Sequence, residues 1–118
     1  MNWPGLPQSV EGLAGPIRVD RPLKVEASDA ETRGLWLTLE RRILVQSTLR
    51  RDTAWMIFFH EFAHSCLDDA GVRLTDDQGE SVCDAMSSGM LRLMRSHLQV
   101  AQTPPQYPSP APTARSAK

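Results

Sequence analysis

The chain has 118 residues, a length that suits a single domain with one hydrophobic core. Its formal net charge is −1 at pH 7, so it lacks the basic excess typical of nucleic-acid-binding surfaces, and no nucleic-acid partner is expected. No apolar run is long enough to span a bilayer and no signal peptide is recognisable, so we expect a cytoplasmic protein without membrane contact. Two cysteines, Cys66 and Cys83, are too few for a disulfide framework and are expected to be reduced thiols.

Composition divides the chain into three parts. Residues 1–15 are interrupted by Pro and Gly and are expected to form a poorly ordered arm. Residues 102–118 are rich in Pro, Ser, Ala and Thr, a composition that buries too little apolar surface to offset the entropy lost on ordering. We therefore expect a disordered tail there, and a folded domain over residues 16–101.

The first half of this domain has the two-residue period of β-strands. Residues 16–26 show this alternation, and Pro22 favours a sheet edge because proline cannot donate a backbone hydrogen bond. Residues 35–40 and 43–47 alternate in the same way on either side of an arginine-containing turn, which predicts an antiparallel hairpin. One face of this small sheet is expected to pack against helices.

From Leu49 onward the apolar residues follow the period of an α-helix, which Gly71 is expected to end as a C-cap. Thr75 and Gln78 have the spacing of a capping box, in which each side chain bonds the other residue's backbone N–H. A second long helix is predicted to begin there and to run to about Val100.

Gly89 lies inside this second helix, where glycine costs about 1 kcal/mol relative to alanine. Its small size is expected to let the two helices approach closely. Strands followed by two long helices define the fold class as α+β, with a small antiparallel sheet preceding the helices.

The most specific chemical signal is the segment HEFAH, from His60 to His64. Residues i and i+4 of a helix share one face, so both imidazoles can reach one zinc ion at about 2.0–2.1 Å. Glu61 lies beside that point and can reach a metal-bound water rather than the metal. The motif alone is only moderately specific, and the alternative is a histidine pair on the surface or in the core without metal.

Two histidines leave a zinc ion short of the three protein ligands that catalytic sites use. Glu80, at the start of the second helix, is the expected third ligand, and its alternative is a carboxylate favoured by the helix dipole. Asp84, one turn later, is expected to accept a hydrogen bond from a zinc-bound histidine, or else to be solvated. Nothing marks His97 as a ligand, and Cys83 is expected to be a small buried residue rather than a ligand.

HEFAH followed by ESVCD resembles the gluzincin pattern HExxH…ExxxD. The succession of hairpin, motif helix and second helix is similar to the ImmA/IrrE family, in particular to the minimal members encoded by phages and mobile elements. This resemblance spans roughly residues 17–99, with its specific motifs confined to the two segments quoted.

The resemblance implies a zincin-like metallopeptidase core with one zinc ion per chain. His60, His64 and Glu80 would be its ligands, Glu61 the general base and Asp84 the residue that orients a ligand. It also implies a polypeptide substrate and the cytoplasm of a bacterial or phage-infected host cell. No His or Tyr is obviously placed to stabilise an oxyanion.

The resulting hypothesis is zinc-dependent hydrolysis of a peptide bond, with the strand at residues 43–46 offering its edge to an extended substrate. Two other interpretations stay open. One is a non-catalytic binding or regulatory module that zinc stabilises, which the missing oxyanion group favours. Glu61 argues against it, because a structural zinc site does not need a general base. The other is a helical adaptor without metal.

Overall fold

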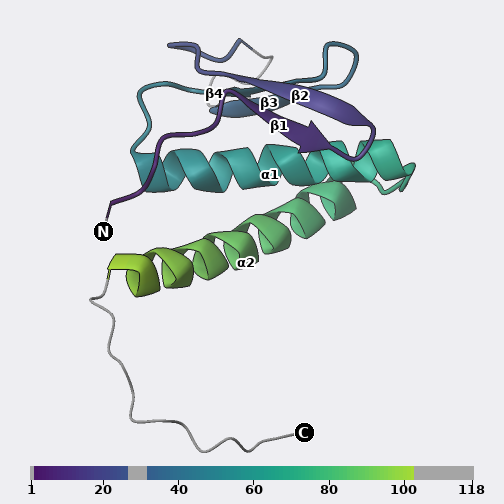
Figure 1. Ribbon diagram of the computed structural model, residues 1–118. Helices are drawn as coiled ribbons and strands as arrows, with labels where there is room; N and C mark the ends of the chain where they lie inside the picture. The colour runs from purple at the N-terminus through teal and green to yellow at the C-terminus, as the bar shows by residue number, and fades with distance from the viewer. Residues whose placement is uncertain (1, 27–31, 103–118) are drawn as a thin grey trace, which may run out of the picture.

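The computed structural model describes residues 2–26 and 32–102. Within these residues, four strands precede two helices in chain order: β1 (Ser9–Gly12), β2 (Gly15–Asp20), β3 (Gly34–Leu37), β4 (Arg42–Val45), α1 (Arg51–Ala70) and α2 (Asp76–Gln102). The sheet, α1 and α2 form three layers, with α1 in the middle (Figure 1). This is the α+β architecture that the sequence predicts, with both long helices in their predicted places.

The sheet is mixed rather than antiparallel, with strand order β1-β2-β4-β3. The outer pairs β1/β2 and β3/β4 are antiparallel, as predicted for the hairpin, but β2 and β4 pair in parallel. The prediction of an edge position for β2 is wrong, because β2 lies between β1 and β4. Pro22 does not interrupt the ladder, since the strand ends before it at Asp20.

Strand β4 also lies inside the sheet, between β2 and β3. Its backbone groups are therefore used on both sides, and the prediction that residues 43–46 offer a free edge to a substrate is wrong. Among the described strands, β3 forms the edge on this side of the sheet, paired with β4 alone.

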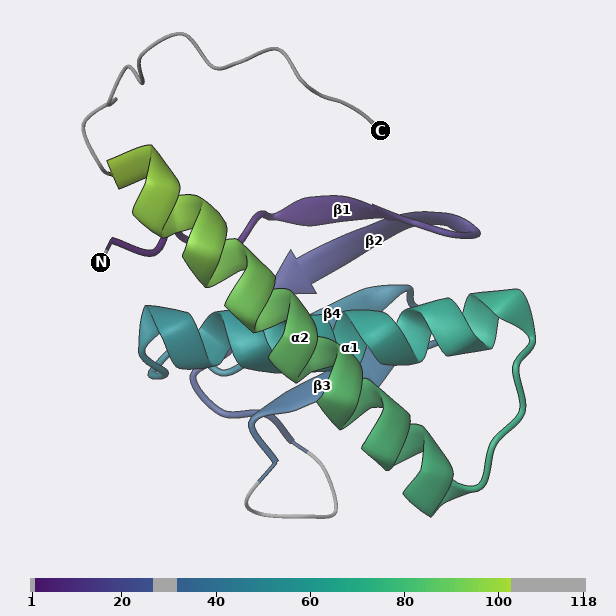
Figure 2. The same cartoon turned by 90° about the horizontal axis from the view of Figure 1, so that it is seen from below.

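The core lies between the sheet and α1. Alternate residues of the two central strands face the helix and are at most 5% exposed: Ile17, Val19, Ile43 and Val45. Burial of such side chains contributes roughly 1.5–3 kcal/mol each. On the helix they meet Ala54, Phe58 and Phe59. Among the described elements, α2 packs against α1 alone and crosses it obliquely (Figure 2).

Both helix boundaries between α1 and α2 are confirmed. Gly71 adopts the left-handed conformation (φ 71°, ψ 23°), and the Val72 N–H donates to the Leu67 carbonyl at 2.9 Å. In the capping box, the Gln78 N–H donates to Thr75 Oγ1 and the Thr75 N–H donates to Gln78 Oε1, each at 3.1 Å. Neither of the described helices has the length and apolar character that a membrane crossing requires.

The expectation for Gly89 is wrong. Gly89 is exposed, and a methyl group added to it would meet no atom within 4 Å. The positions of α2 that pack closely against α1 are Cys83 and Ser87, which are 0% and 3% exposed. Gly89 follows Ser87 by two residues, about 200° around the helix, and therefore lies on the face of α2 that points away from α1.

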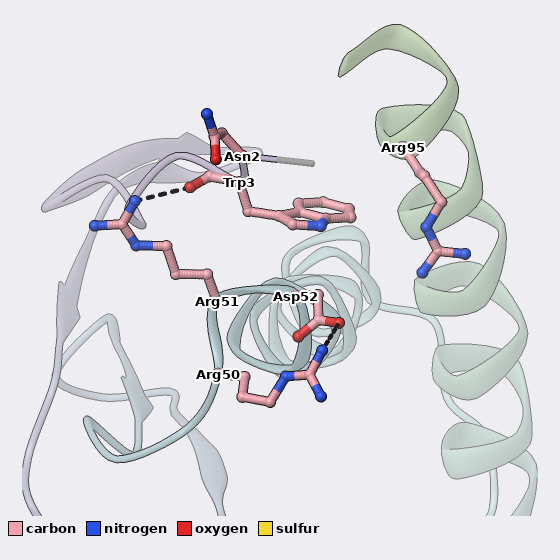
Figure 3. Close-up of a pocket in the computed structure, with 6 residues that line it drawn as sticks. All are labelled: Asn2, Trp3, Arg50, Arg51, Asp52 and Arg95. Atoms are coloured by element: carbon pink, nitrogen blue, oxygen red, sulfur yellow. Dashed lines mark hydrogen bonds and ion pairs between the residues drawn. The ribbon is translucent and has the colours of Figure 1, made fainter. Parts of the chain in front are cut away.

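The expectation of a poorly ordered arm over residues 1–15 is also wrong, because this segment contributes β1 and a buried tryptophan. Trp3 is 8% exposed. Its carbonyl accepts a hydrogen bond from Arg51 Nη1 at 2.9 Å (Figure 3), and the next carbonyl, of Pro4, accepts one from Trp55 Nε1 at 2.8 Å. Indole burial and these two bonds to α1 order a segment whose Pro and Gly content suggested otherwise. Of the predicted Pro-rich tail, residues 102–118, Gln102 is the last residue of α2, and residues 103–118 lie outside the described part of the chain.

Candidate metal centre

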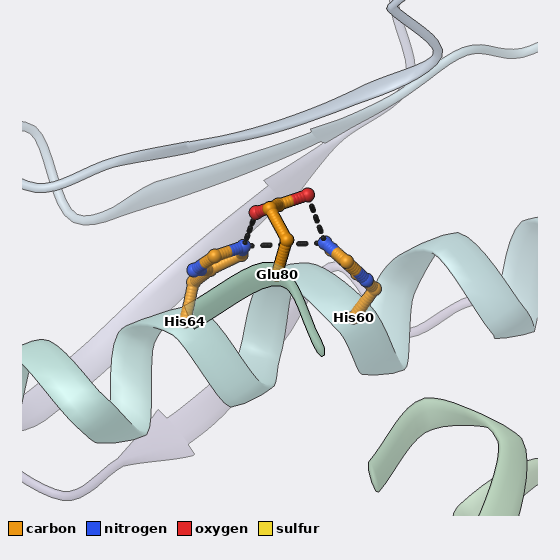
Figure 4. Close-up of side chains that lie close together, drawn as sticks. All are labelled: His60, His64 and Glu80. Atoms are coloured by element: carbon orange, nitrogen blue, oxygen red, sulfur yellow. Dashed lines mark hydrogen bonds and ion pairs between the residues drawn. The ribbon is translucent and has the colours of Figure 1, made fainter. Parts of the chain in front are cut away.

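Three side chains from the two helices meet at one point. His60 and His64 project from successive turns of α1, and Glu80 reaches them from the second turn of α2 (Figure 4). The two Nε2 atoms lie 3.2 Å apart. The Glu80 carboxylate places Oε1 at 3.3 Å from His60 Nε2 and Oε2 at 2.5 Å from His64 Nε2. The residues predicted as ligands are therefore neighbours in space.

Two of these three distances fit a tetrahedral metal site, while the third, 2.5 Å between His64 Nε2 and Glu80 Oε2, is a hydrogen-bond distance shorter than such a site has between ligands. Ligand atoms bound at about 2.0–2.1 Å with tetrahedral angles lie about 3.3–3.4 Å from one another. The His60–His64 and His60–Glu80 separations of 3.2 and 3.3 Å are close to this value, and the potential ligand atoms all lie within 4.8 Å of one another. Two imidazole nitrogens and one carboxylate oxygen are a donor set that suits zinc, although other divalent transition metals accept it too.

Asp84 lies where the sequence predicts, one turn beyond Glu80. Its Oδ1 is 2.9 Å from His60 Nδ1, although the Asp84 side chain is 74% exposed. A donated Nδ1–H fixes the tautomer in which Nε2 carries the lone pair, and this lone pair points toward Glu80 and His64. The Asp84 contact therefore prepares His60 to bind a cation through Nε2.

Glu61 lies beside the cluster but not in it, since the described group that can hold a metal consists of His60, His64 and Glu80. Its carboxyl accepts a hydrogen bond from the backbone of Trp36 on β3. Burial raises the pKa of Glu61 above its usual value; Glu80 adds to the rise, and the two histidines and the Trp36 backbone oppose it. A carboxylate with a raised pKa is a better proton acceptor near neutral pH.

The cluster opens onto a groove beneath β3. Two adjoining hollows of about 420 and 590 Å³ share Thr32, Gly34, His60, Glu61 and Glu80 as lining residues. The first continues to Trp36, Thr38 and Asp68, and the second to Met56 and Ile57 on α1 and Ser87 and Ser88 on α2. The described lining of the two hollows contains no tyrosine and no histidine other than His60 and His64.

The weaker ligand candidates stay outside the cluster. Cys83 is completely buried, and burial first and nearby Glu80 second raise the pKa of its thiol to about 11, which disfavours the thiolate that a metal requires. His97 is exposed and lies 17 residues beyond Glu80, about 25 Å along the helix axis. Neither Cys66 nor Cys83 forms a disulfide.

Sequence reasoning missed three residues around the groove: Trp36, Thr38 and Asp68. Trp36 Nε1 and Thr38 Oγ1 both donate to Asp68 Oδ2, at 2.7 and 2.9 Å. These contacts span 30 or more positions of the chain. No local pattern announces such a pairing, and only a correct placement of β3 over α1 reveals it.

No protein-family model matches this chain, and searches of curated protein sequences and of solved structures find no significant match either.

Proposed function

We propose that this chain is a small zinc-dependent metallopeptidase of the gluzincin type, with a zincin-like core. One observation carries the proposal: a His/His/Glu cluster adjoins a separate, partly buried carboxylate, Glu61, on an open groove. A structural zinc site is normally closed by a fourth protein ligand, whereas the described cluster offers three. Three ligands leave one position for water or substrate, and Glu61 stands next to it.

The chemistry proposed for this site is hydrolysis of a peptide bond. When bound, zinc would supply Lewis acidity, polarising the scissile carbonyl and promoting the ionisation of water. Glu61 accepts a proton from the water as its oxygen attacks the carbonyl carbon. Glu61 then returns this proton to the amide nitrogen as the C–N bond breaks, so the products are an amine and a carboxylic acid, which gives up the second proton of the water when it ionises.

The groove suits an extended polypeptide. Among the described strands, β3 is the edge strand beside the cluster, and its Trp36 backbone contacts Glu61. An extended peptide can add to such an edge through main-chain hydrogen bonds, which recognise a polypeptide without selecting one sequence. This assigns to β3 the role that the sequence analysis gave to the strand at residues 43–46.

The test is a Glu61→Gln variant assayed beside the parent on unstructured peptides, with the zinc content of both measured. Glutamine keeps the size of the side chain and can still accept from Trp36, but it cannot take a proton. We expect zinc to be retained and hydrolysis to fall at least about 100-fold. Asp77→Asn, an equal loss of charge in the first turn of α2, is the control and should leave the rate unchanged.

Two results would contradict the proposal. If the Glu61→Gln variant cleaves as fast as the parent, Glu61 is not the general base. A zinc-loaded parent that cleaves no peptide would favour the alternative, a binding module that zinc stabilises.

A further inference from the structure

The last turn of α1 holds the edge strand in place through one oxygen atom. Asp68 Oδ2 accepts hydrogen bonds from the Trp36 indole Nε1, at 2.7 Å, and from Thr38 Oγ1, at 2.9 Å. Asp68 lies one turn beyond His64 on the same helix, while Trp36 is in β3 and Thr38 follows it. We call these three residues the Asp68 anchor. It joins the free edge of the sheet to the helix that carries the metal cluster.

A second contact is made with the ring of the same indole. The guanidinium of Arg41 lies 5.6 Å from the centroid of the Trp36 ring. Arg41 is itself fixed by Asp69, whose two carboxylate oxygens it contacts at 2.9 Å each and whose side chain is 6% exposed. Trp36 is thus held by consecutive aspartates of α1, directly by Asp68 and through Arg41 by Asp69.

The backbone of the same tryptophan contacts Glu61. Trp36 therefore links the anchor to the carboxylate next to the metal cluster. Its indole N–H bonds Asp68, and its backbone N–H bonds Glu61. Movement of β3 away from α1 would change the position of its edge relative to Glu61. Both Trp36 and Asp68 also line the groove beside His64.

We propose that Asp68 is a positioning residue for the hydrolysis proposed above, setting the place of the β3 edge over Glu61 and the groove. Its Oδ2 atom accepts the hydrogen bonds of both Trp36 and Thr38, so Asp68 acts through the strand rather than on the reacting atoms. This inference rests on the proposed function, and it adds a residue outside the HExxH…ExxxD pattern.

The experiment compares Asp68→Ala with Asp68→Asn in the zinc-loaded protein. Alanine removes the acceptor, whereas the amide oxygen of asparagine keeps two lone pairs and can accept from both donors. We expect kcat/KM for peptide hydrolysis to fall about 10-fold or more in Asp68→Ala, since misplacement of binding groups by about 1 Å can cost up to 100-fold. Asp68→Asn should stay within about 3-fold of the parent, because a neutral acceptor keeps the geometry with weaker bonds.

Two further measurements separate positioning from general loss of structure. Hydrogen exchange of the Trp36 indole N–H, followed by NMR, should accelerate in Asp68→Ala and stay slow in Asp68→Asn, whatever the activity. Asp20→Ala is the matched control, since Asp20 joins Arg18 and Arg42 on the strands β2 and β4 and lines no part of the groove. Its kcat/KM should equal that of the parent at a temperature where both are folded.

The outcomes are distinct. If the zinc-loaded parent has no peptidase activity, the proposed function is contradicted, and the positioning role of Asp68, which rests on it, is contradicted too. If the parent is active, the inference about Asp68 alone is overturned when Asp68→Ala exposes the indole N–H to exchange yet keeps the kcat/KM of the parent. Equal losses in Asp68→Ala and Asp20→Ala also overturn it, since they would indicate a merely structural role.

Discussion

Replacement of Gly34 by alanine tests how closely β3 must lie on α1. Gly34 is the first residue of β3 and lines both hollows of the groove. A Cβ atom at this position would lie 2.2 Å from Ile57 Cγ2 and 3.3 Å from both Glu61 Cγ and the Leu44 carbonyl oxygen. The backbone conformation itself tolerates alanine, so the effect comes from these contacts, of which the one with Ile57 on the helix is much the shortest.

The expected loss of stability follows from the overlap between the new Cβ atom and Ile57 Cγ2. Ordinary van der Waals contact begins near 3.4 Å, so about 1.2 Å of extra separation is needed between β3 and Ile57. Overpacking of this kind costs about 1–3 kcal/mol of unfolding free energy. For a domain of this size, each kcal/mol lowers Tm by roughly 4–8 °C. A shift of about 1 Å in the strand that borders Glu61 should also lower kcat/KM up to about 100-fold.

The assay is urea unfolding of four proteins: the parent, Gly34→Ala, Ile57→Ala and the double variant. Ile57→Ala removes Cγ2 and makes room for the new methyl group, so Gly34→Ala should cost at least about 1 kcal/mol less in that background. The reasoning is refuted if Gly34→Ala is as stable as the parent, or if it costs the same in both backgrounds.

Three other predictions follow from particular contacts. Asp84→Ala should weaken zinc affinity about 10–100-fold in competition with a chelator, because His60 loses the partner of Nδ1; an unchanged affinity would show that the contact does not orient the ring. Gly89→Ala should raise the unfolding free energy by about 1 kcal/mol in urea titrations, since the site is open and helical; destabilisation would reveal a neighbour that the structure lacks. The bond to Arg41 lowers the pKa of Asp69 below its ordinary value of 3.8. The ionised Asp69 therefore stabilises the fold above pH 3.8, and this stabilisation is lost as the pH falls through the lower pKa of the folded state. Asp69→Asn should therefore be less stable than the parent at pH 7 and converge with it in strong acid, and a stability difference that does not depend on pH would contradict this.

Local signals in the sequence predicted the parts of the molecule that local physics decides. The four-residue spacing of His60 and His64 needs only a helix to bring both rings to one side, and the helix formed there. The capping box at Thr75 and the left-handed Gly71 likewise follow from a few neighbouring residues. Because the loop between them is short, these two ends also determined that Glu80 returns toward α1.

Pairing over long distances in sequence was not predictable in the same way. The parallel pairing of β2 with β4 depends on which strand the chain places between β2 and β3, and alternation of apolar residues does not encode that choice. Strand β1 has one large apolar residue in four, Val10, and so carries almost no pattern. The position of the β3 edge over Glu61 follows only from the strand order. The contact between Trp36 and Asp68 depends on that same position of β3.

The central claim is that His60, His64 and Glu80 hold one catalytic zinc ion. Elemental analysis of the purified protein, beside a His60→Ala/His64→Ala variant, tests it most directly. We predict about one zinc per chain in the parent and none in the variant. A parent that binds no zinc after reconstitution, or a variant that binds as much as the parent, would contradict the account and remove the basis for the proposed peptidase.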